Sequence, residues 1–241
     1  MNSIALLVPV CSRNQNYKTF ADTPFVKYLF PSFIRTFSVG YSSFLCPQYI
    51  DYSYTFYIGI DETDEFYTSR VADFNKFYRP KINIQCVFLK DCEHKPAHAW
   101  NKLYEIAYND NHNYFYQLGD DIEMLHPWTD TFIQILEARE NKGVVGARHD
   151  VNYLGRVQQG KTPVIENAFV HRTHYQLFKT FFNKEIENWY CDDWITEVYN
   201  PHYSTICSNI KIKNHVMDRY KIKNIGEKIK KLIKQDKKII A

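Results

Sequence analysis

Apolar runs alternate with amphipathic segments over about the first 140 residues of this 241-residue chain. The run at 3–10 is continuous, which is typical of a β-strand covered on both faces. Further strands are expected at 52–60, 83–89 and 113–118, and helices at 25–37, 64–78, 97–109 and 128–140. This order predicts an α/β fold with a mostly parallel central sheet and helices on both of its faces.

The later part of the chain follows a looser pattern. Strands are expected at 143–150 and 204–216, a strand and then a helix at 167–182, and a helix at 188–199. The polar segment at 150–166 reads as a loop over a binding site. We therefore expect one domain at 1–218, followed by a basic tail at 219–241.

Charge is distributed unevenly along the chain. The segment from Lys211 to Ala241 carries 11 Lys and Arg against 3 Asp and Glu, whereas the remainder carries 19 against 24. An acidic body argues against nucleic acid as a partner. The scattered cysteines, without a C-x-x-C pair, favour free thiols in a reducing compartment. The apolar start lacks a basic leader region and stops at Pro9, so we expect a cytoplasmic protein.

Carboxylates cluster where predicted strands end. Asp61 follows the second strand, and Asp120 and Asp121 follow the fourth in the stretch YFYQLGDDIEML. In open parallel sheets, ligands bind beyond the carboxyl ends of the strands. Paired carboxylates there suit Mn²⁺ or Mg²⁺ shared with a diphosphate, although a solvated turn explains them too. A polymerase palm uses a similar GDD hairpin, but 241 residues hardly allow the remaining polymerase domains.

The order of motifs resembles that of nucleotide-sugar glycosyltransferases with the GT-A fold, over about residues 4–215. The segments that carry this resemblance are LLVPVCSRN, YIGIDETDEFY, KPAHAWNKLYEIA, YFYQLGDDIEM, AFVHRTHYQLF, NWYCDDWITEVY and IKIKNHV. The chain looks most similar to small glycosyltransferase domains encoded by large DNA viruses. The resemblance implies a hexosyltransferase that moves a sugar from a nucleotide donor, such as UDP-glucose, to a hydroxyl group of a glycan or protein.

The same resemblance implies roles for individual residues. Asp121 would bind the metal ion and His215 would be a second ligand, although a lone histidine is as often structural. Gly119 replaces the first carboxylate of a strict D-x-D motif. Candidate contacts to the donor nucleotide-sugar are Pro9, Val10, Arg13, Asp61, Lys95, Asn101 and Asp120.

A second acidic pair lies in CDDWI. By the resemblance, Asp193 would be the general base of an inverting reaction, with Asp192 as its neighbour. A nucleoside diphosphate leaves without protonation when a metal ion neutralises it, so one carboxylate can suffice. Either aspartate could instead cap the following helix. Trp189 and Trp194 are candidates for stacking on an acceptor sugar or for the core, and His171 and His174 for ligand contacts or packing.

The tail is expected to form an amphipathic basic helix with an apolar stripe of Ile222, Ile225, Ile229, Leu232 and Ile233, interrupted at Gly226. The stripe could pack on the domain, on a second copy of the chain, or at an anionic membrane surface.

Gly119 also leaves open a second hypothesis for the whole chain. It could be a non-catalytic module that binds a nucleotide-sugar or a glycan.

Overall fold

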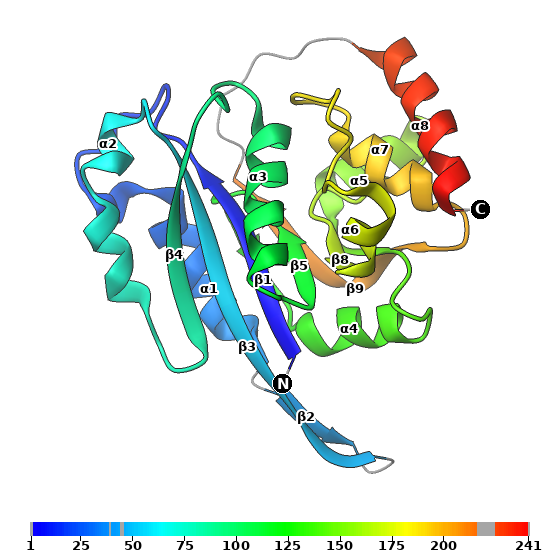
Figure 1. Cartoon of the computed structure of the whole chain (residues 1–241), viewed down its shortest axis with the longest axis horizontal. Coiled ribbons are helices and arrows are strands. Elements are labelled where there is room, and N and C mark those ends of the chain that lie inside the picture. Colours follow the sequence, from blue (N-terminus) through cyan, green and yellow to red (C-terminus); the bar gives the residue numbers. More distant parts are fainter. Residues whose placement is uncertain (1, 39, 44–45, 216–224, 241) are drawn as a thin grey trace.

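A computed structural model describes residues 2–38, 40–43, 46–215 and 225–240. The described strands form one sheet in the order β2-β3-β1-β5-β8-β7-β9-β6, and β4 pairs with β3 (Figure 1). Their bounds are β1 (Asn2–Val10), β2 (Gly40–Ser43), β3 (Cys46–Asp61), β4 (Ile82–Leu89), β5 (Tyr114–Gln117), β6 (Ile122–Met124), β7 (Val144–His149), β8 (Phe169–His171) and β9 (Ser204–Asn214).

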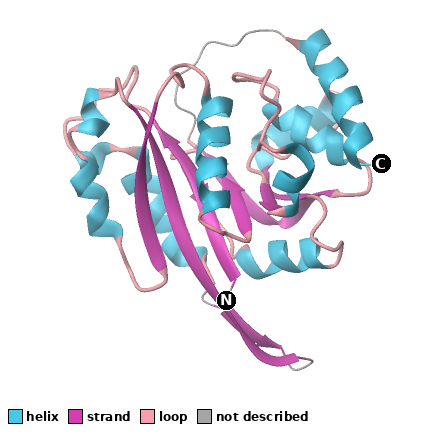
Figure 2. Cartoon of the chain, viewed as in Figure 1, coloured by secondary structure: helices cyan, strands magenta, loops and turns pink. Residues whose placement is uncertain are grey.

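The α-helices are α1 (Phe30–Thr36), α2 (Glu65–Thr68), α3 (Pro96–Asn109), α4 (Thr129–Glu137), α5 (Asp150–Gln158), α6 (Thr173–Phe178), α7 (Cys191–Tyr199) and α8 (Gly226–Ile240). Two 3₁₀-helices cover Phe20–Asp22 and Val71–Phe77, and a π-helix at Phe25–Leu29 leads into α1. Helices lie on both faces of the sheet (Figure 2). The α/β prediction with a mostly parallel sheet and a C-terminal helix is therefore confirmed.

Strand β1 lies at the centre of the fold because it is buried on both faces. Ile4, Leu6 and Val8 contribute to the core that includes α1 and α4, whereas Ala5 and Leu7 contribute to the core of α3, α6, α7 and α8. Alternate side chains of a strand point to opposite faces, so both sets must be apolar. This explains the unbroken apolar run at the start of the sequence.

The parallel strands around β1 form the predicted ligand-binding edge. Strand β1 runs parallel to β3 on one side and to β5 on the other, and β4 continues the parallel set beyond β3. The second half of the sheet is mixed, since β5 and β7 pair antiparallel with β8, and β6 pairs antiparallel with β9. The carboxyl ends of β1, β3, β4 and β5 therefore open at one edge.

Two local predictions were wrong. The predicted loop at 150–166 begins as helix α5, and its apolar residues Val151, Leu154 and Val157 recur at helical spacing despite Gly155. The predicted helix at 64–78 is the short helix α2 followed by a 3₁₀-helix, with a break at Arg70.

The expected free thiols are present at the cysteines whose side chains are described, Cys11, Cys86, Cys92, Cys191 and Cys207. No helix in the described ranges combines the length and the apolar character needed to cross a bilayer.

Helix α8 packs on the domain through its apolar stripe. Ile229 and Leu232 are buried in the same core as Trp194 of α7. Gly226 begins this helix and does not interrupt it, whereas Ile222 and the predicted boundary at 218 lie outside the described residues. Of the alternatives for the tail, packing on the domain accounts for this stripe. The exposed face of α8 carries Lys231, Lys234 and Lys238.

A buried carboxylate fixes α8 to α7. Asp236 Oδ2 accepts hydrogen bonds from Trp194 Nε1 at 2.9 Å and from Asn183 Nδ2 at 2.7 Å. Burial of an acceptor is tolerated only when donors satisfy it, and the same holds for the buried indole N–H. Asp236 therefore joins the C-terminal helix to the segments on both sides of the Asp192-Asp193 pair.

We expect Asp236→Ala to lower the free energy of unfolding by about 1–3 kcal/mol, because it leaves the buried Trp194 N–H without an acceptor. Urea unfolding followed by tryptophan fluorescence measures this change. Lys234→Ala on the exposed face of the same helix is the matched control and should change stability little. Equal stabilities for the two variants would contradict the role assigned to Asp236.

Candidate functional site

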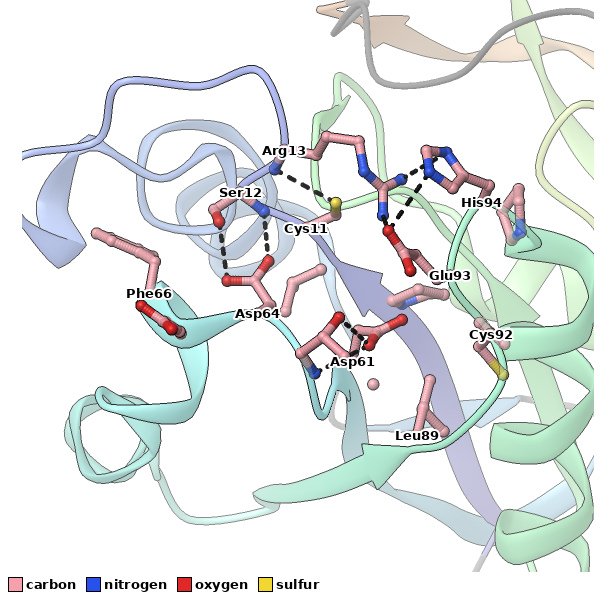
Figure 3. A pocket seen from close by; sticks show the side chains of 17 residues that line it. Cys11, Ser12, Arg13, Asp61, Asp64, Phe66, Leu89, Cys92, Glu93 and His94 are labelled. Carbon is pink, nitrogen blue, oxygen red and sulfur yellow. Dashed lines mark hydrogen bonds and ion pairs between the residues drawn. The ribbon is translucent and has the colours of Figure 1, made fainter.

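A cavity of about 360 Å³ opens at the carboxyl ends of β1, β3 and β4 (Figure 3). Four residues predicted to contact the donor line it, namely Pro9, Val10, Arg13 and Asp61. Cys11 and Ser12, which lie between the predicted contacts Val10 and Arg13, also line it. The lining is completed by residues that the sequence did not single out: Gly59, Thr63, Asp64, Glu65, Phe66, Leu89, Cys92, Glu93, His94, Pro96 and Ala99. The predicted ligand edge of the sheet thus holds a cavity of the size of a small-molecule site.

Asp64 fixes the wall of the cavity formed by the end of β1. Its Oδ2 accepts a hydrogen bond from Ser12 N at 2.7 Å, and its Oδ1 accepts one from Ser12 Oγ at 2.8 Å (Figure 3). The same carboxylate caps α2 by accepting from Tyr67 N at 3.1 Å. Sequence reasoning missed this residue, although an aspartate directly before a helical pattern is the usual signal of an N-cap.

Asp61 lies at the end of β3, where its carboxylate is held within the turn. Thr63 donates to Asp61 Oδ1 from its backbone N at 3.1 Å and from its Oγ1 at 2.8 Å. Gly59 lies two residues earlier, where a Cβ would come within 2.8 Å of Leu89 Cδ1 and 3.0 Å of Leu103 Cδ1. A glycine there lets α3 pack closely on the sheet, and the start of α3 forms one wall of the cavity.

The rim carries the cationic side chain of Arg13. Its guanidinium donates to Glu93 Oε1 at 3.2 Å and lies 3.1 Å from His94 Nδ1. These contacts join the loop after β1 to the loop after β4. Because Glu93 and His94 are largely exposed, the ion pair is worth little in stability. Arg13 can therefore exchange these partners for an anionic ligand at small cost.

The predicted metal ligands come together at the end of β5. Leu118 N donates to Leu7 O at 3.1 Å, so the chain leaves the sheet beside the carboxyl end of β1. Asp120 is fully buried there and Asp121 is partly exposed. The antiparallel pairing of β6 with β9 then places His215 beside Asp121, whose carbonyl oxygen accepts from His215 N at 3.0 Å.

This pair fits a divalent cation in part. A Cβ at Gly119 would lie 2.5 Å from Asp121 Oδ1, so the Asp121 carboxylate occupies the space that a side chain at 119 would need. Carboxylate oxygen and imidazole nitrogen are both ligands for Mn²⁺, and carboxylate oxygen also suits Mg²⁺. Across the described residues, no group of three or more His, Cys, Asp or Glu side chains forms a metal-binding set. A cation here would need oxygen ligands from a bound diphosphate.

Two residues predicted to contact the donor have other partners. The side-chain amide of Asn101 forms two hydrogen bonds with the backbone of Phe182. Phe182 N donates to Asn101 Oδ1 at 2.7 Å, and Asn101 Nδ2 donates to Phe182 O at 3.0 Å. Lys95 Nζ lies 3.8 Å from the side-chain Oε1 of Glu187. The backbone carbonyl oxygen of Glu187 accepts a hydrogen bond from Ala97 N at 3.1 Å. Neither side chain is among those that line the described cavity. Both instead hold the 182–187 segment along α3.

That segment leads to the second acidic pair, at the start of α7. The N-cap position belongs to Tyr190 in the left-handed conformation, with φ 74°, and no side chain caps the helix. The capping interpretation of Asp192 and Asp193 is therefore wrong. Both lie in the first turn of α7, where the helix dipole favours negative charge.

The two aspartates have different surroundings. Asp193 Oδ1 accepts from Arg156 of α5 at 2.8 Å, which holds the carboxylate in place. Burial raises the pKa of Asp192 well above its ordinary value, and the negative charge of Glu166 raises it further. Glu166 Oε2 in turn lies 3.0 Å from His149 Nδ1, and this hydrogen bond raises the pKa of His149. Arg156, Glu166 and His149 had no motif that marked them in the sequence.

Several aromatic and histidine candidates belong to the core. Trp194 is fully buried, so its proposed stacking on an acceptor sugar is excluded, whereas Trp189 is 48% exposed and keeps that option. His174 is buried, and both of its ring nitrogens have hydrogen-bond partners. Nδ1 lies 2.7 Å from Tyr199 Oη, and Nε2 lies 2.9 Å from Phe181 O. Burial lowers the pKa values of His171 and His174 to about 4, so both are neutral at physiological pH.

Comparison with known proteins supports the fold. No protein-family model and no curated protein matches the chain. Among solved structures, S. aureus TarS is similar with a TM-score of 0.54 and 10% identity, over 90% of this chain and 37% of that one. A structure of TarS 1–349 in complex with UDP is similar with a TM-score of 0.56 and 10% identity, over 98% of this chain and 65% of that one. The chain thus spans less than two thirds of either TarS chain and shares a GT-A-like fold with them.

The His149–Glu166 pair gives a pH-dependent prediction. Because the raised pKa favours protonated His149 in the folded state, the stability that the pair contributes is complete below about pH 6.5. It is lost as the pH rises through the raised pKa. In Glu166→Gln the pKa of His149 should fall below its ordinary value, since burial then dominates. The ring C–H chemical shift followed by NMR against pH measures both values.

Glu105→Gln, at an exposed carboxylate of α3, is the control for this experiment and should leave the His149 titration unchanged. A His149 pKa at or below its ordinary value in the unmodified protein would contradict the assigned hydrogen bond.

Proposed function

We propose that the chain is a metal-dependent glycosyltransferase that moves a sugar from a nucleotide-sugar, a UDP-sugar in the first instance, to a hydroxyl group of a glycan or protein. TarS, with the same fold, is a glycosyltransferase, and one of its structures contains UDP. The observation that carries the proposal is the position of the Asp121–His215 pair. It lies where β5 ends beside β1, and the carboxyl end of β1 opens into the cavity.

The cavity would hold the nucleotide of the donor. Asp61 would accept hydrogen bonds from the uracil or the ribose. Asp120 is fully buried, so its predicted contact with the ribose or with a metal-bound water is not part of this proposal. The backbone of Pro9 and Val10 at the end of β1 would line the same pocket. Arg13, on the rim, is the cation placed to attract a diphosphate.

Asp121 and His215 would hold Mn²⁺ or Mg²⁺ together with oxygen atoms of the donor diphosphate. When bound, the cation neutralises the negative charge that develops on the leaving nucleoside diphosphate. Two protein ligands imply modest affinity in the absence of nucleotide. Metal binding should therefore be much tighter when UDP is present.

Asp193 would act as the general base that takes the proton of the acceptor hydroxyl. Its carboxylate is held by Arg156 and lies in the first turn of α7, so it stays oriented without a ligand. A base opposite the leaving group implies inversion at the anomeric carbon. Asp192, whose raised pKa favours the protonated form, would remain a neighbour of the base without taking the proton itself.

The non-catalytic binding module is the second candidate function. The ion pair between Arg156 and Asp193 favours it, because a carboxylate oxygen that is engaged by the guanidinium is not turned to an acceptor hydroxyl. Release of UDP from a panel of UDP-sugars, with Mn²⁺ and with EDTA, separates the two. Metal-dependent release supports the transferase, whereas UDP binding without turnover in the presence of acceptors supports the module. Absence of both turnover and UDP-induced thermal stabilisation would overturn both.

Asp193→Asn and Asp121→Asn should fail in different ways. Loss of the base lowers transfer by about 10²–10⁴-fold while UDP still binds. Loss of the metal ligand removes the Mn²⁺-dependent part of UDP affinity. Calorimetric UDP titrations with Mn²⁺ and with EDTA, together with UDP-release rates, measure both effects. Normal turnover in Asp193→Asn, or unchanged Mn²⁺ dependence in Asp121→Asn, would remove that residue from the mechanism.

Gly119→Ala should weaken Mn²⁺ binding in the presence of UDP, because the new methyl group takes the space of the Asp121 carboxylate. Calorimetry with Mn²⁺ and UDP measures the change. Gly155→Ala is the matched control, since a Cβ there meets nothing within 4 Å. Equal Mn²⁺ affinities for the two alanine variants would show that the position of the Asp121 carboxylate does not matter.

A further inference from the structure

The imidazole of His215 is held on several sides. Its Nε2 lies 2.9 Å from Glu123 Oε2. The ring of Tyr28 stacks on it, with centroids 3.7 Å apart and an interplanar angle of 6°. The backbone of His215 is bonded to Asp121. These contacts fix the plane of the ring and its rotation within that plane.

The contact with Glu123 also decides which ring nitrogen carries the proton. An ionised carboxylate only accepts hydrogen bonds, so Nε2 must be the donor in the neutral imidazole. The lone pair then lies on Nδ1. Nδ1 is the ring nitrogen nearer to the backbone, and in His215 that backbone is paired with Asp121.

Glu123 is itself well placed for this task. It lies in β6 between Ile122 and Met124, which are buried in the core, so alternation directs its side chain to the opposite face. Its Oε1 lies 3.6 Å from the guanidinium of Arg35. That pair is partly exposed and adds little to stability, but it engages Oε1 of Glu123 while Oε2 faces His215.

We propose that Glu123 is a positioning residue that fixes the Nε2–H tautomer of His215 and presents Nδ1 as the metal-binding nitrogen. This inference rests on the proposed metal-dependent function, and it concerns a residue that would not touch the metal ion. Carboxylates that orient a ligating histidine typically change metal affinity by about 10–100-fold when they are removed. Glu123→Ala should therefore weaken Mn²⁺ binding by about that factor.

The first test reads the tautomer without any metal ion. Two-bond ¹H–¹⁵N correlation spectra at a fixed pH of about 8, where an ordinary histidine is neutral, distinguish protonated from unprotonated ring nitrogens. The unmodified protein should show Nε2 protonated and Nδ1 unprotonated in His215. Glu123→Ala should show a mixture, and Glu123→Gln, which keeps an acceptor oxygen, should lie between them. An Nδ1–H tautomer in the unmodified protein, or no change in Glu123→Ala, would overturn the inference.

The second test measures Mn²⁺ affinity by electron paramagnetic resonance in the presence of UDP. A residue that acts only through His215 should have no effect once His215 is gone, so Glu123→Ala/His215→Ala should equal His215→Ala alone. Glu105→Ala on α3 is the control and should bind Mn²⁺ like the unmodified protein. Additive losses in the double variant would overturn the positioning role.

The two proposals fail in recognisably different ways. If the unmodified protein binds Mn²⁺ with UDP and loses it in His215→Ala but not in Glu123→Ala, the inference is wrong and the proposed function stands. If the unmodified protein binds no Mn²⁺ with UDP, the proposed function fails, and the metal-directed role of Glu123 falls with it.

Discussion

Burial of β1 on both faces is the constraint on which the rest of the structure depends. Because its odd and even side chains both enter a core, helices must cover the two faces of the sheet, and β3 and β5 must pair with its two edges. The polar residues that follow β1, β3 and β5 then meet at one edge. The candidate site is thus a consequence of how the apolar segments pack.

The candidate site has two parts that are supported in different ways. The cavity beside β1 depends on close packing and on local hydrogen bonds, above all the bonds from Ser12 to Asp64 and the approach of α3 to Gly59. The acidic pair of α7 depends on long-range contacts. The 182–187 segment follows α3, and Asp236 of the C-terminal helix ties Trp194 and Asn183 together. The C-terminal helix is therefore part of the support of the acidic pair in α7.

Environment separates carboxylates that look alike in the sequence. Asp192 and Asp193 are adjacent, but the guanidinium of Arg156 holds Asp193, whereas burial and the negative charge of Glu166 raise the pKa of Asp192. Asp120 and Asp121 are also adjacent, and one is fully buried while the other is partly exposed. Such differences in surroundings give adjacent residues of the same type different chemical roles.

The sequence by itself determined the α/β order, because apolar period and turn residues are local properties of the chain. It also directed attention to Asp61 and Asp121, because both follow predicted strands, whereas the roles of Asp193 and His215 rest on the resemblance and stay predictions. Only the tertiary structure decided which hydrogen-bond and ion-pair partners these side chains have. Asn101 forms hydrogen bonds with the backbone of Phe182, and Glu123 forms one with His215. Arg156 donates to Asp193 from helix α5, which lies in a segment that was predicted to be a loop. Hydrogen bonds and ion pairs between distant segments leave no local pattern, because their geometry exists only after the chain has folded.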